Sequence, residues 1–282
     1  MLLPACGLRL QQRSRFLLVS SLLVVVIAAG PVRGQDAPRV DDREPDDAPI
    51  DGATQPAGPA KTPRHTGVRA MVKNLIDDTK HLPGKENMVW AGFGGWAALT
   101  FHPLDEETTA ALASNKTVER AFKPGAVLGQ LPTLMAAAVT IYVVGRTRDA
   151  PKVSHVGMDL IQALAISEGV VQLIKVATQR QRPDGTGGSF PSGHSADTFA
   201  FATALERHLG WKGAVPAYIF SSYVAISRIP ARRHWLSDAM FGASVGVIAG
   251  RTVTRHGREF PLVIAPTAHG GVMVRYVHRE TP

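Results

Sequence analysis

From residue 67 to about residue 254, apolar residues recur at helical spacing in one segment after another. Gly, Pro and charged clusters separate these segments, which predicts helices joined by short loops. The expected helices cover residues 68–80, 88–101, 106–121, 126–145, 153–180, 195–209, 213–227 and 235–254. We therefore expect an all-α fold, a helical bundle.

The two ends of the chain differ from this central part. Residues 1–34 place arginines before an uncharged apolar run at 16–29, which predicts an exported chain with a cleaved signal peptide; an uncleaved anchor is the alternative. Residues 35–66 are acidic and rich in proline, which predicts a disordered linker. The helical domain is expected at 67–256. In residues 257–282, β-branched residues flank a His-Gly-Gly turn, which predicts a C-terminal β-hairpin or tail.

Charge and hydropathy limit the choice of partner and compartment. The formal net charge is +8, but four basic residues fall within the first 34, so the rest of the chain gives no argument for nucleic acid as a partner. Only residues 124–145 stay uncharged over the roughly 20 residues that a membrane span needs. We expect a periplasmic protein, soluble or associated with the membrane surface. An integral inner-membrane protein is the alternative, because charged residues within spans can mark a buried site. No oligomeric state can be read from the sequence.

A first polar cluster lies in "KVATQRQRP", where Lys175 and Arg182 are seven residues apart and share one helix face. Taken alone, a solvated basic helix end is the simpler interpretation.

A second cluster, "PSGH", runs into an apolar helical segment, so Ser192 or Ser195 is the expected N-cap. Ser192 offers a hydroxyl, Gly193 allows close approach of the backbone to a ligand, and His194 exchanges a proton near neutral pH. An ordinary capped turn with an exposed histidine is the alternative.

A third cluster, "SRIPARRHWLSD", places His234 and Asp238 four residues apart at a helix start, where the carboxylate can orient the imidazole. Arg228 lies before Pro230 and must reach the site from the preceding helix end. A surface pair on an arginine-rich corner is the alternative.

Together, the three clusters supply cations, backbone donors, a hydroxyl and two histidines, which is what phosphoryl transfer needs. Their order and spacing, Lys175 to Pro183, Pro191 to His194 and Ser227 to Asp238, resemble the three signature motifs of the type 2 phosphatidic acid phosphatase superfamily. That superfamily includes bacterial nonspecific acid phosphatases and vanadium haloperoxidases. The resemblance implies a helical bundle of the phosphatidic acid phosphatase and haloperoxidase type.

The resemblance also implies a mechanism. His234 would attack phosphorus and form a phosphohistidine, while Asp238 holds the other ring nitrogen. His194 would protonate the leaving alcohol and then activate water. The phosphate would be bound by Lys175, Arg182 and Arg228, with the Ser192 hydroxyl and the Gly193 amide. No metal or other cofactor is expected, and the sequence has no HExxH or CxxC motif.

The sequence leaves several substrates and reaction types open. The expected substrate is a phosphorylated small molecule, a prenyl pyrophosphate or a lipid phosphate. A vanadate-dependent haloperoxidase and a non-catalytic phosphate-binding module are the alternatives.

Overall fold

The computed structural model describes residues 67–254, 262–266 and 272–276, so the expected signal peptide and linker lie outside the described residues. Its helices are α2 (Val68–Lys80), α3 (Lys85–Phe101), the 3-10 helix η2 (His102–Leu104), α4 (Asp105–Ala113), α5 (Lys116–Leu128), α6 (Leu131–Thr147), α7 (Pro151–Thr178), α8 (Gly193–Leu209), α9 (Trp211–Ser227) and α10 (Leu236–Val253). Two short strands, β1 (Leu262–Pro266) and β2 (Val272–Tyr276), pair antiparallel in the segment where a hairpin is expected. The all-α fold class is confirmed.

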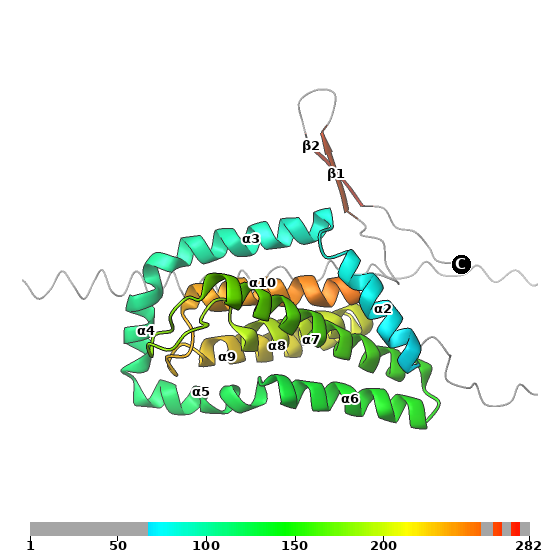
Figure 1. The fold of residues 1–282 in the computed structure, drawn as a ribbon, viewed down its shortest axis with the longest axis horizontal. Helices are drawn as coiled ribbons and strands as arrows, with labels where there is room; N and C mark the ends of the chain where they lie inside the picture. The colour runs from blue at the N-terminus through cyan, green and yellow to red at the C-terminus, as the bar shows by residue number, and fades with distance from the viewer. Residues whose placement is uncertain (1–66, 255–261, 267–271, 277–282) are drawn as a thin grey trace, which may run out of the picture.

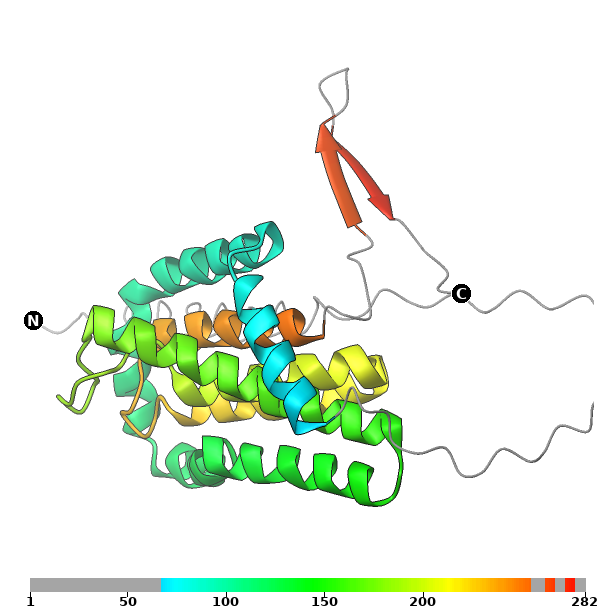
Figure 2. The ribbon, with the colours of Figure 1, turned by 45° about the vertical axis from the view of Figure 1, so that its right-hand side comes forward.

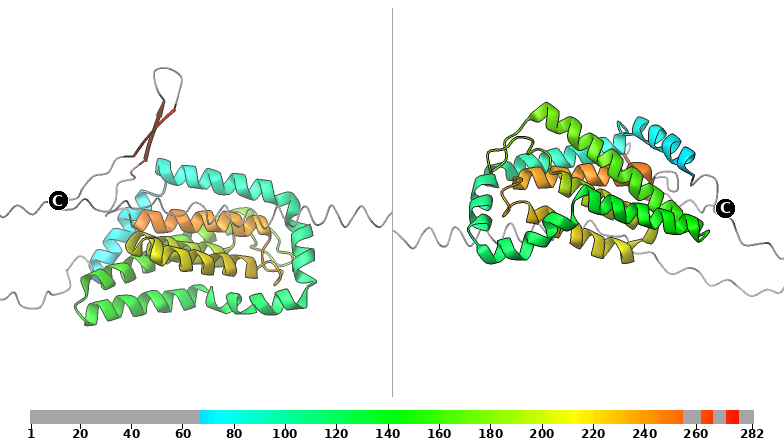
Figure 3. Two further views of the ribbon diagram at one scale, coloured as in Figure 1. Left: turned by 180° about the vertical axis from the view of Figure 1, so that it is seen from behind. Right: turned by 60° about the horizontal axis from the view of Figure 1, so that its bottom comes forward.

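Helix α8 lies at the centre of the bundle and packs against α7, α9 and α10. Outside this group, α3 covers α10, α6 covers α7, and α5 packs on α9. Helix α4 joins the two outer layers at one end of the bundle, while α2 contacts α7 and α10 towards the other end (Figures 1 and 2). The views from behind and from below show the same layers (Figure 3). Because α7, α8, α9 and α10 run back and forth, the loop from α7 to α8 and the loop from α9 to α10 both lie at the α4 end (Figure 1).

The apolar side chains of these helices pack against one another and form the core of the bundle. Leucines of α7, including the fully buried Leu160 and Leu164, meet small residues of α8 and α10 such as Ala200 and Ala249. Burial of each large apolar side chain stabilises the fold by about 1.5–3 kcal/mol. Two glycines of α10 set its distance from α8: a Cβ at Gly242 would lie 2.5 Å from the Ser192 carbonyl oxygen, and one at Gly246 would lie 2.2 Å from that of Ala196. This close approach fixes the start of α8 against α10.

Two helix boundaries differ from the sequence expectation. The single helix expected at 106–121 is divided, because Asn115 accepts hydrogen bonds from the amides of Thr117 and Val118 and so caps α5. Helix α5 then continues through Pro124 and ends at Leu128, and α6 starts at Leu131 after a bend of 49°. The break was expected at residues 122–125 but lies at Gly129 and Gln130, so the second helix starts five residues later than expected.

The outer helices expose many large apolar side chains. They include Val89 and Leu99 of α3, which are 72% and 76% exposed, Val139 and Val143 of α6, and Val215 and Ile219 of α9. Among the described residues, α7 is the one helix that is long and apolar enough by itself to cross a membrane, and the bent pair α5 and α6 would count as a second.

Candidate active site

A cavity of about 310 Å³ opens at the loop end of the bundle. Helix α7 ends there, α8 and α6 begin there, and the loop between α9 and α10 closes one side. Six of the eight residues that the sequence predicts for the site line this cavity: Lys175, Arg182, Gly193, His194, Arg228 and His234. The remaining two, Ser192 and Asp238, are fully buried next to the lining residues.

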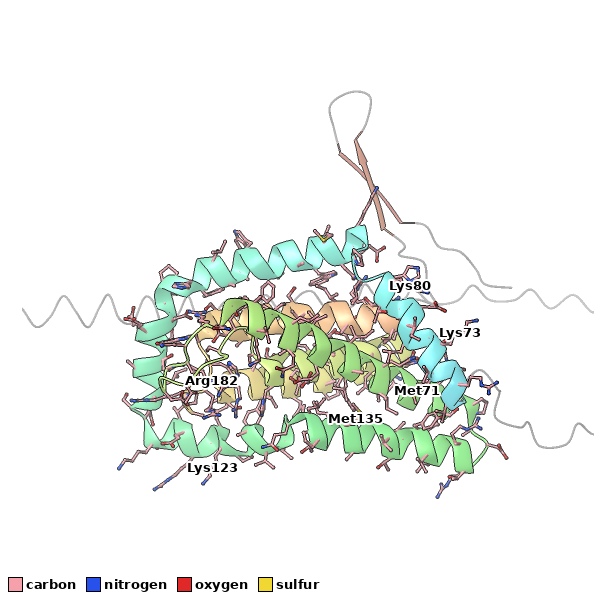
Figure 4. All side chains as sticks on the ribbon, in the orientation of Figure 1. Met71, Lys73, Lys80, Lys123, Met135 and Arg182 are labelled. Carbon is pink, nitrogen blue, oxygen red and sulfur yellow. The ribbon has the colours of Figure 1, made fainter. Side chains whose placement is uncertain are left out.

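Backbone carbonyls hold two of the cations in place. The Lys175 ammonium donates to the Gly188 carbonyl at 2.6 Å, and the Arg182 guanidinium approaches the same oxygen at 3.4 Å. The expectation that Arg182 shares a helix face with Lys175 is wrong, because α7 ends at Thr178 and Arg182 lies in the loop that follows, at the α4 end of the molecule (Figure 4). Because a carbonyl neutralises no charge, both cations keep their attraction for an anion in the cavity.

Arg228, the C-cap of α9, is the least compensated cation of the site. It is only 8% exposed, its Nε has no hydrogen-bond partner among the described residues, and no carboxylate of those residues lies within ion-pair distance. Burial, together with the nearby Arg233 and Arg182, lowers the pKa of its guanidinium to about 10. A buried cation normally has a partner, so Arg228 is placed to bind an anion that enters the cavity.

The start of α8 presents His194 to the cavity. Ser192 is the N-cap, as expected: its Oγ accepts from the Ser195 amide at 3.4 Å, and its own amide donates to the Asp238 carbonyl at 3.0 Å. The His194 Nε2 lies 3.1 Å from the Ala126 carbonyl of α5. Gly193, in the first turn of α8, offers one of the amides that a helix start leaves unpaired.

His234 is buried and held through Nδ1. The nearer acceptor is the Ser189 carbonyl at 2.7 Å, whereas the Asp238 carboxylate lies 3.8 Å from Nδ1. The sequence-based expectation placed Asp238 alone in this role. In the neutral ring, a bond from Nδ1–H leaves the lone pair on Nε2, the atom available for attack. Burial lowers the pKa of His234 despite the opposing effect of Asp238, so the ring stays neutral further into the acid range.

A buried network behind His234 contains four residues that the sequence analysis did not single out. The Arg180 guanidinium donates to Asp238 at 2.7 Å and to Asp105 of α4 at 2.8 Å. Asp105 also accepts from the amide and the hydroxyl of Ser237, at 2.9 and 2.6 Å. The Ser189 hydroxyl donates to Asp238 as well. This network fixes the carboxylate of Asp238 and joins α4 to the site.

Arg180 lies between Lys175 and Arg182 in sequence, but its guanidinium binds carboxylates rather than a carbonyl. Asp105 precedes it by 75 residues. In the sequence, Arg180 is one basic residue within a basic motif, and Asp105 is one acid at the start of a helix. Neither signal indicates that the two residues form an ion pair.

Seven further residues line the cavity without having been predicted: Gln130, Leu131, Pro132, Glu168, Gln172, Asp197 and Arg233. Within the part of the chain that the structure describes, no group of three His, Cys, Asp or Glu side chains is arranged to hold a metal ion.

The sequence model of the PAP2 superfamily matches residues 156–260, a stretch that contains all three polar clusters. This region is therefore similar to the PAP2 superfamily. The resemblance drawn from the motifs is thereby confirmed.

The proteins similar to this chain include two curated proteins and a solved structure. A lipid A 1-phosphatase of Porphyromonas gingivalis is 42% identical over 91 residues, which is 31% of this chain and 20% of that protein. A PA-phosphatase related-family protein of Dictyostelium discoideum is 28% identical over 134 residues, 37% of this chain and 49% of that protein. The chain thus spans a fifth and about half of the lengths of these two relatives.

The solved structure is that of a transmembrane PAP2 type phosphatidylglycerolphosphate phosphatase from Bacillus subtilis. It is 20% identical, superposes with a TM-score of 0.53, and covers 60% of this chain and 94% of its own. At this identity the likeness concerns the fold, which is shared by the two helical bundles.

Proposed function

We propose that this PAP2 protein is a phosphatase that hydrolyses lipid phosphates through a phosphohistidine on His234, without a metal ion. The observation that supports this most directly is the buried, uncompensated Arg228 at a cavity that also presents Lys175 and Arg182. Among the described residues these three cations form no ion pair with a carboxylate, so their charge is available to a phosphoryl group in the cavity.

The proposed reaction has two steps. In the first, Nε2 of His234 attacks phosphorus, the bond from phosphorus to the ester oxygen breaks, and His194 gives its proton to the departing oxygen. In the second, His194 takes a proton from water, the oxygen of that water attacks phosphorus, and the bond between phosphorus and Nε2 breaks. Inorganic phosphate leaves, and both histidines return to their initial states.

Charge stabilisation completes the mechanism. Lys175, Arg182 and Arg228 bind the non-reacting oxygens, on which negative charge collects in the transition state. The Gly193 amide donates to the same group, and the Ser192 hydroxyl is the further proposed donor. Asp238, fixed by Arg180, keeps its negative charge beside the histidine that becomes covalently modified.

The choice of lipid phosphates rests on the relatives and on the surface. A relative is named a lipid A 1-phosphatase, and the similar fold belongs to a phosphatidylglycerolphosphate phosphatase. Large apolar side chains, including Leu173 and Val176 on the last turns of α7, are exposed close to the cavity. An apolar rim beside a cationic cavity suits a substrate that has acyl chains and a phosphorylated head.

Phosphate release by the purified chain tests this function. With phosphatidic acid in mixed detergent micelles and p-nitrophenyl phosphate as substrates, we expect faster release from the lipid and no change on addition of EDTA. Turnover of the soluble ester alone would overturn the lipid assignment, and loss of activity in EDTA would overturn metal independence.

We further propose that the bundle lies within the membrane, with the cavity at one of its surfaces. Helices of 17 residues, such as α3, α6 and α9, are about 26 Å long, close to the roughly 30 Å of a bilayer core. Their outward apolar side chains would face lipid. The apolar run at 16–29, outside the described residues, is proposed to direct export of the chain, with the cavity on the periplasmic side.

Fractionation of membranes tests this location. The chain is expected to remain in the pellet after a wash in alkaline carbonate and to enter solution only with detergent. Release by carbonate alone would instead identify a peripheral protein.

A further inference from the structure

One wall of the cavity does not fit a site that binds only phosphate. Glu168 and Gln172 of α7 line it together with Gln130 at the break between α5 and α6. A carboxylate beside an anion site weakens the binding of the anion, because like charges repel. Glu168 therefore lowers the affinity for phosphate unless it binds another part of the substrate.

The position of His194 shows which part of the substrate this wall meets. In phosphoryl transfer the attacking and leaving atoms lie roughly in line on opposite sides of phosphorus. His234 attacks from the loop between α9 and α10, and His194 protonates the leaving oxygen from the start of α8. His194 also contacts the Ala126 carbonyl, just before the α5 to α6 break. The leaving group thus lies between that break and α7.

Glu168 faces this space with one oxygen available. Its Oε1 accepts a hydrogen bond from Gln172, while Oε2 has no hydrogen-bond partner among the described residues. A Cβ placed on Gly193 would lie 3.7 Å from Oε2, so this oxygen lies next to the first turn of α8, which carries His194. Asp197, the other acid of the cavity wall, is buried and already accepts from Ser167 at 2.9 Å.

We propose that Glu168 accepts a hydrogen bond from a hydroxyl group of the leaving alcohol, next to the phosphate-bearing carbon, and so selects lipid phosphates whose head group carries such a hydroxyl. This inference rests on the proposed phosphatase function and adds a substrate class to it. Acidic residues on membrane-spanning helices usually mark functional sites, which agrees with this role. Phosphatidic acid, whose neighbouring hydroxyl is acylated, prenyl phosphates and simple alkyl phosphates would be slower substrates than such lipids, since they have no donor for Oε2.

A matched pair of substrates tests the inference: hexadecyl phosphate and 2-hydroxyhexadecyl phosphate, presented in the same micelles to the full chain. A hydrogen bond to a charged group changes kcat/KM by about 10- to 100-fold. We expect the wild-type chain to prefer the hydroxylated substrate by this factor. In Glu168→Ala the ratio should fall to near one, because the hydroxylated substrate loses its acceptor while the plain one loses a repulsive charge.

Two variants separate this role from a structural one. Glu168→Gln retains an acceptor without the charge and should keep part of the preference. Glu119→Ala, an exposed acid on the first turn of α5, is the matched control and should keep all of it. Because the readout is a ratio within one preparation, partial unfolding of a variant does not change it.

The experiment distinguishes failure of the role of Glu168 from failure of the proposed phosphatase function. Equal turnover of both substrates by the wild-type chain, or a preference that survives Glu168→Ala, overturns the role of Glu168 and leaves the phosphatase intact. If the folded wild-type chain hydrolyses neither these substrates nor phosphatidic acid, the proposed function fails and the inference fails with it.

Discussion

Replacing His234 with alanine is expected to lower the rate of phosphate release by a factor of ~10⁴ or more, because the nucleophile of the first step is removed. The side chain is buried and its Nδ1 is bound to the Ser189 carbonyl, so no neighbouring group can take over the attack in the same geometry. Initial rates with phosphatidic acid in micelles measure the effect.

The control for this variant is His81→Ala. His81 is exposed and hydrogen-bonds the Asp77 carbonyl on the surface of α2, away from the cavity lining. Its replacement should leave the rate unchanged. If His234→Ala stays within tenfold of the wild-type rate, His234 is not the nucleophile.

Replacing Arg180 with alanine is expected to destabilise the folded chain by roughly 3–5 kcal/mol, because one change removes the cation between two buried carboxylates. Asp105 and Asp238 are 3% and 0% exposed, and both lose their ion pair with the guanidinium. The midpoint of thermal unfolding in detergent measures the loss. Arg180→Lys should recover only part of it, since an ammonium cannot bridge two carboxylates as the planar guanidinium does.

A surface ion pair provides the control. Lys80 and Asp77 lie 2.9 Å apart on α2, but their side chains are 66% and 40% exposed. Lys80→Ala should therefore change the free energy of unfolding by about 0–1 kcal/mol. An Arg180→Ala variant as stable as this control would show that the buried network does not stabilise the site.

The sequence predicted those parts of the site that depend on the spacing of residues within one segment of the chain. Helical periodicity gave the bundle, and the spacing of Lys175, Arg182, His194 and His234 predicted residues that line one cavity. The cap at Ser192 was also predictable, because a small polar residue before an apolar helix is a local signal.

Contacts between distant segments could not be predicted in this way. The partner of the His234 Nδ1 is a backbone carbonyl, which every residue carries and which has no sequence signature. Asp105 reaches Arg180 only because α4 closes the end of the bundle. The role of Glu168 likewise depends on the packing of α7 against the start of α8, which brings its Oε2 close to Gly193.

The split between α4 and α5 had a different cause. The Asn115 side chain accepts hydrogen bonds from the amides of the following turn and so starts a new helix there. The apolar pattern alone continues across this position and therefore predicted a single helix.

Trapping of the covalent intermediate tests the central claim most directly. Phosphatidic acid labelled in its phosphate is mixed with the wild-type chain and with His194→Ala, which should slow the breakdown of the intermediate, and the reaction is quenched in alkali, where phosphohistidine is stable. Peptide mass spectrometry then locates the label. We predict phosphate on His234 in both chains, with more in His194→Ala, and none in His234→Ala. Label on another residue, or an unlabelled His194→Ala chain that still releases phosphate, would contradict the phosphohistidine mechanism.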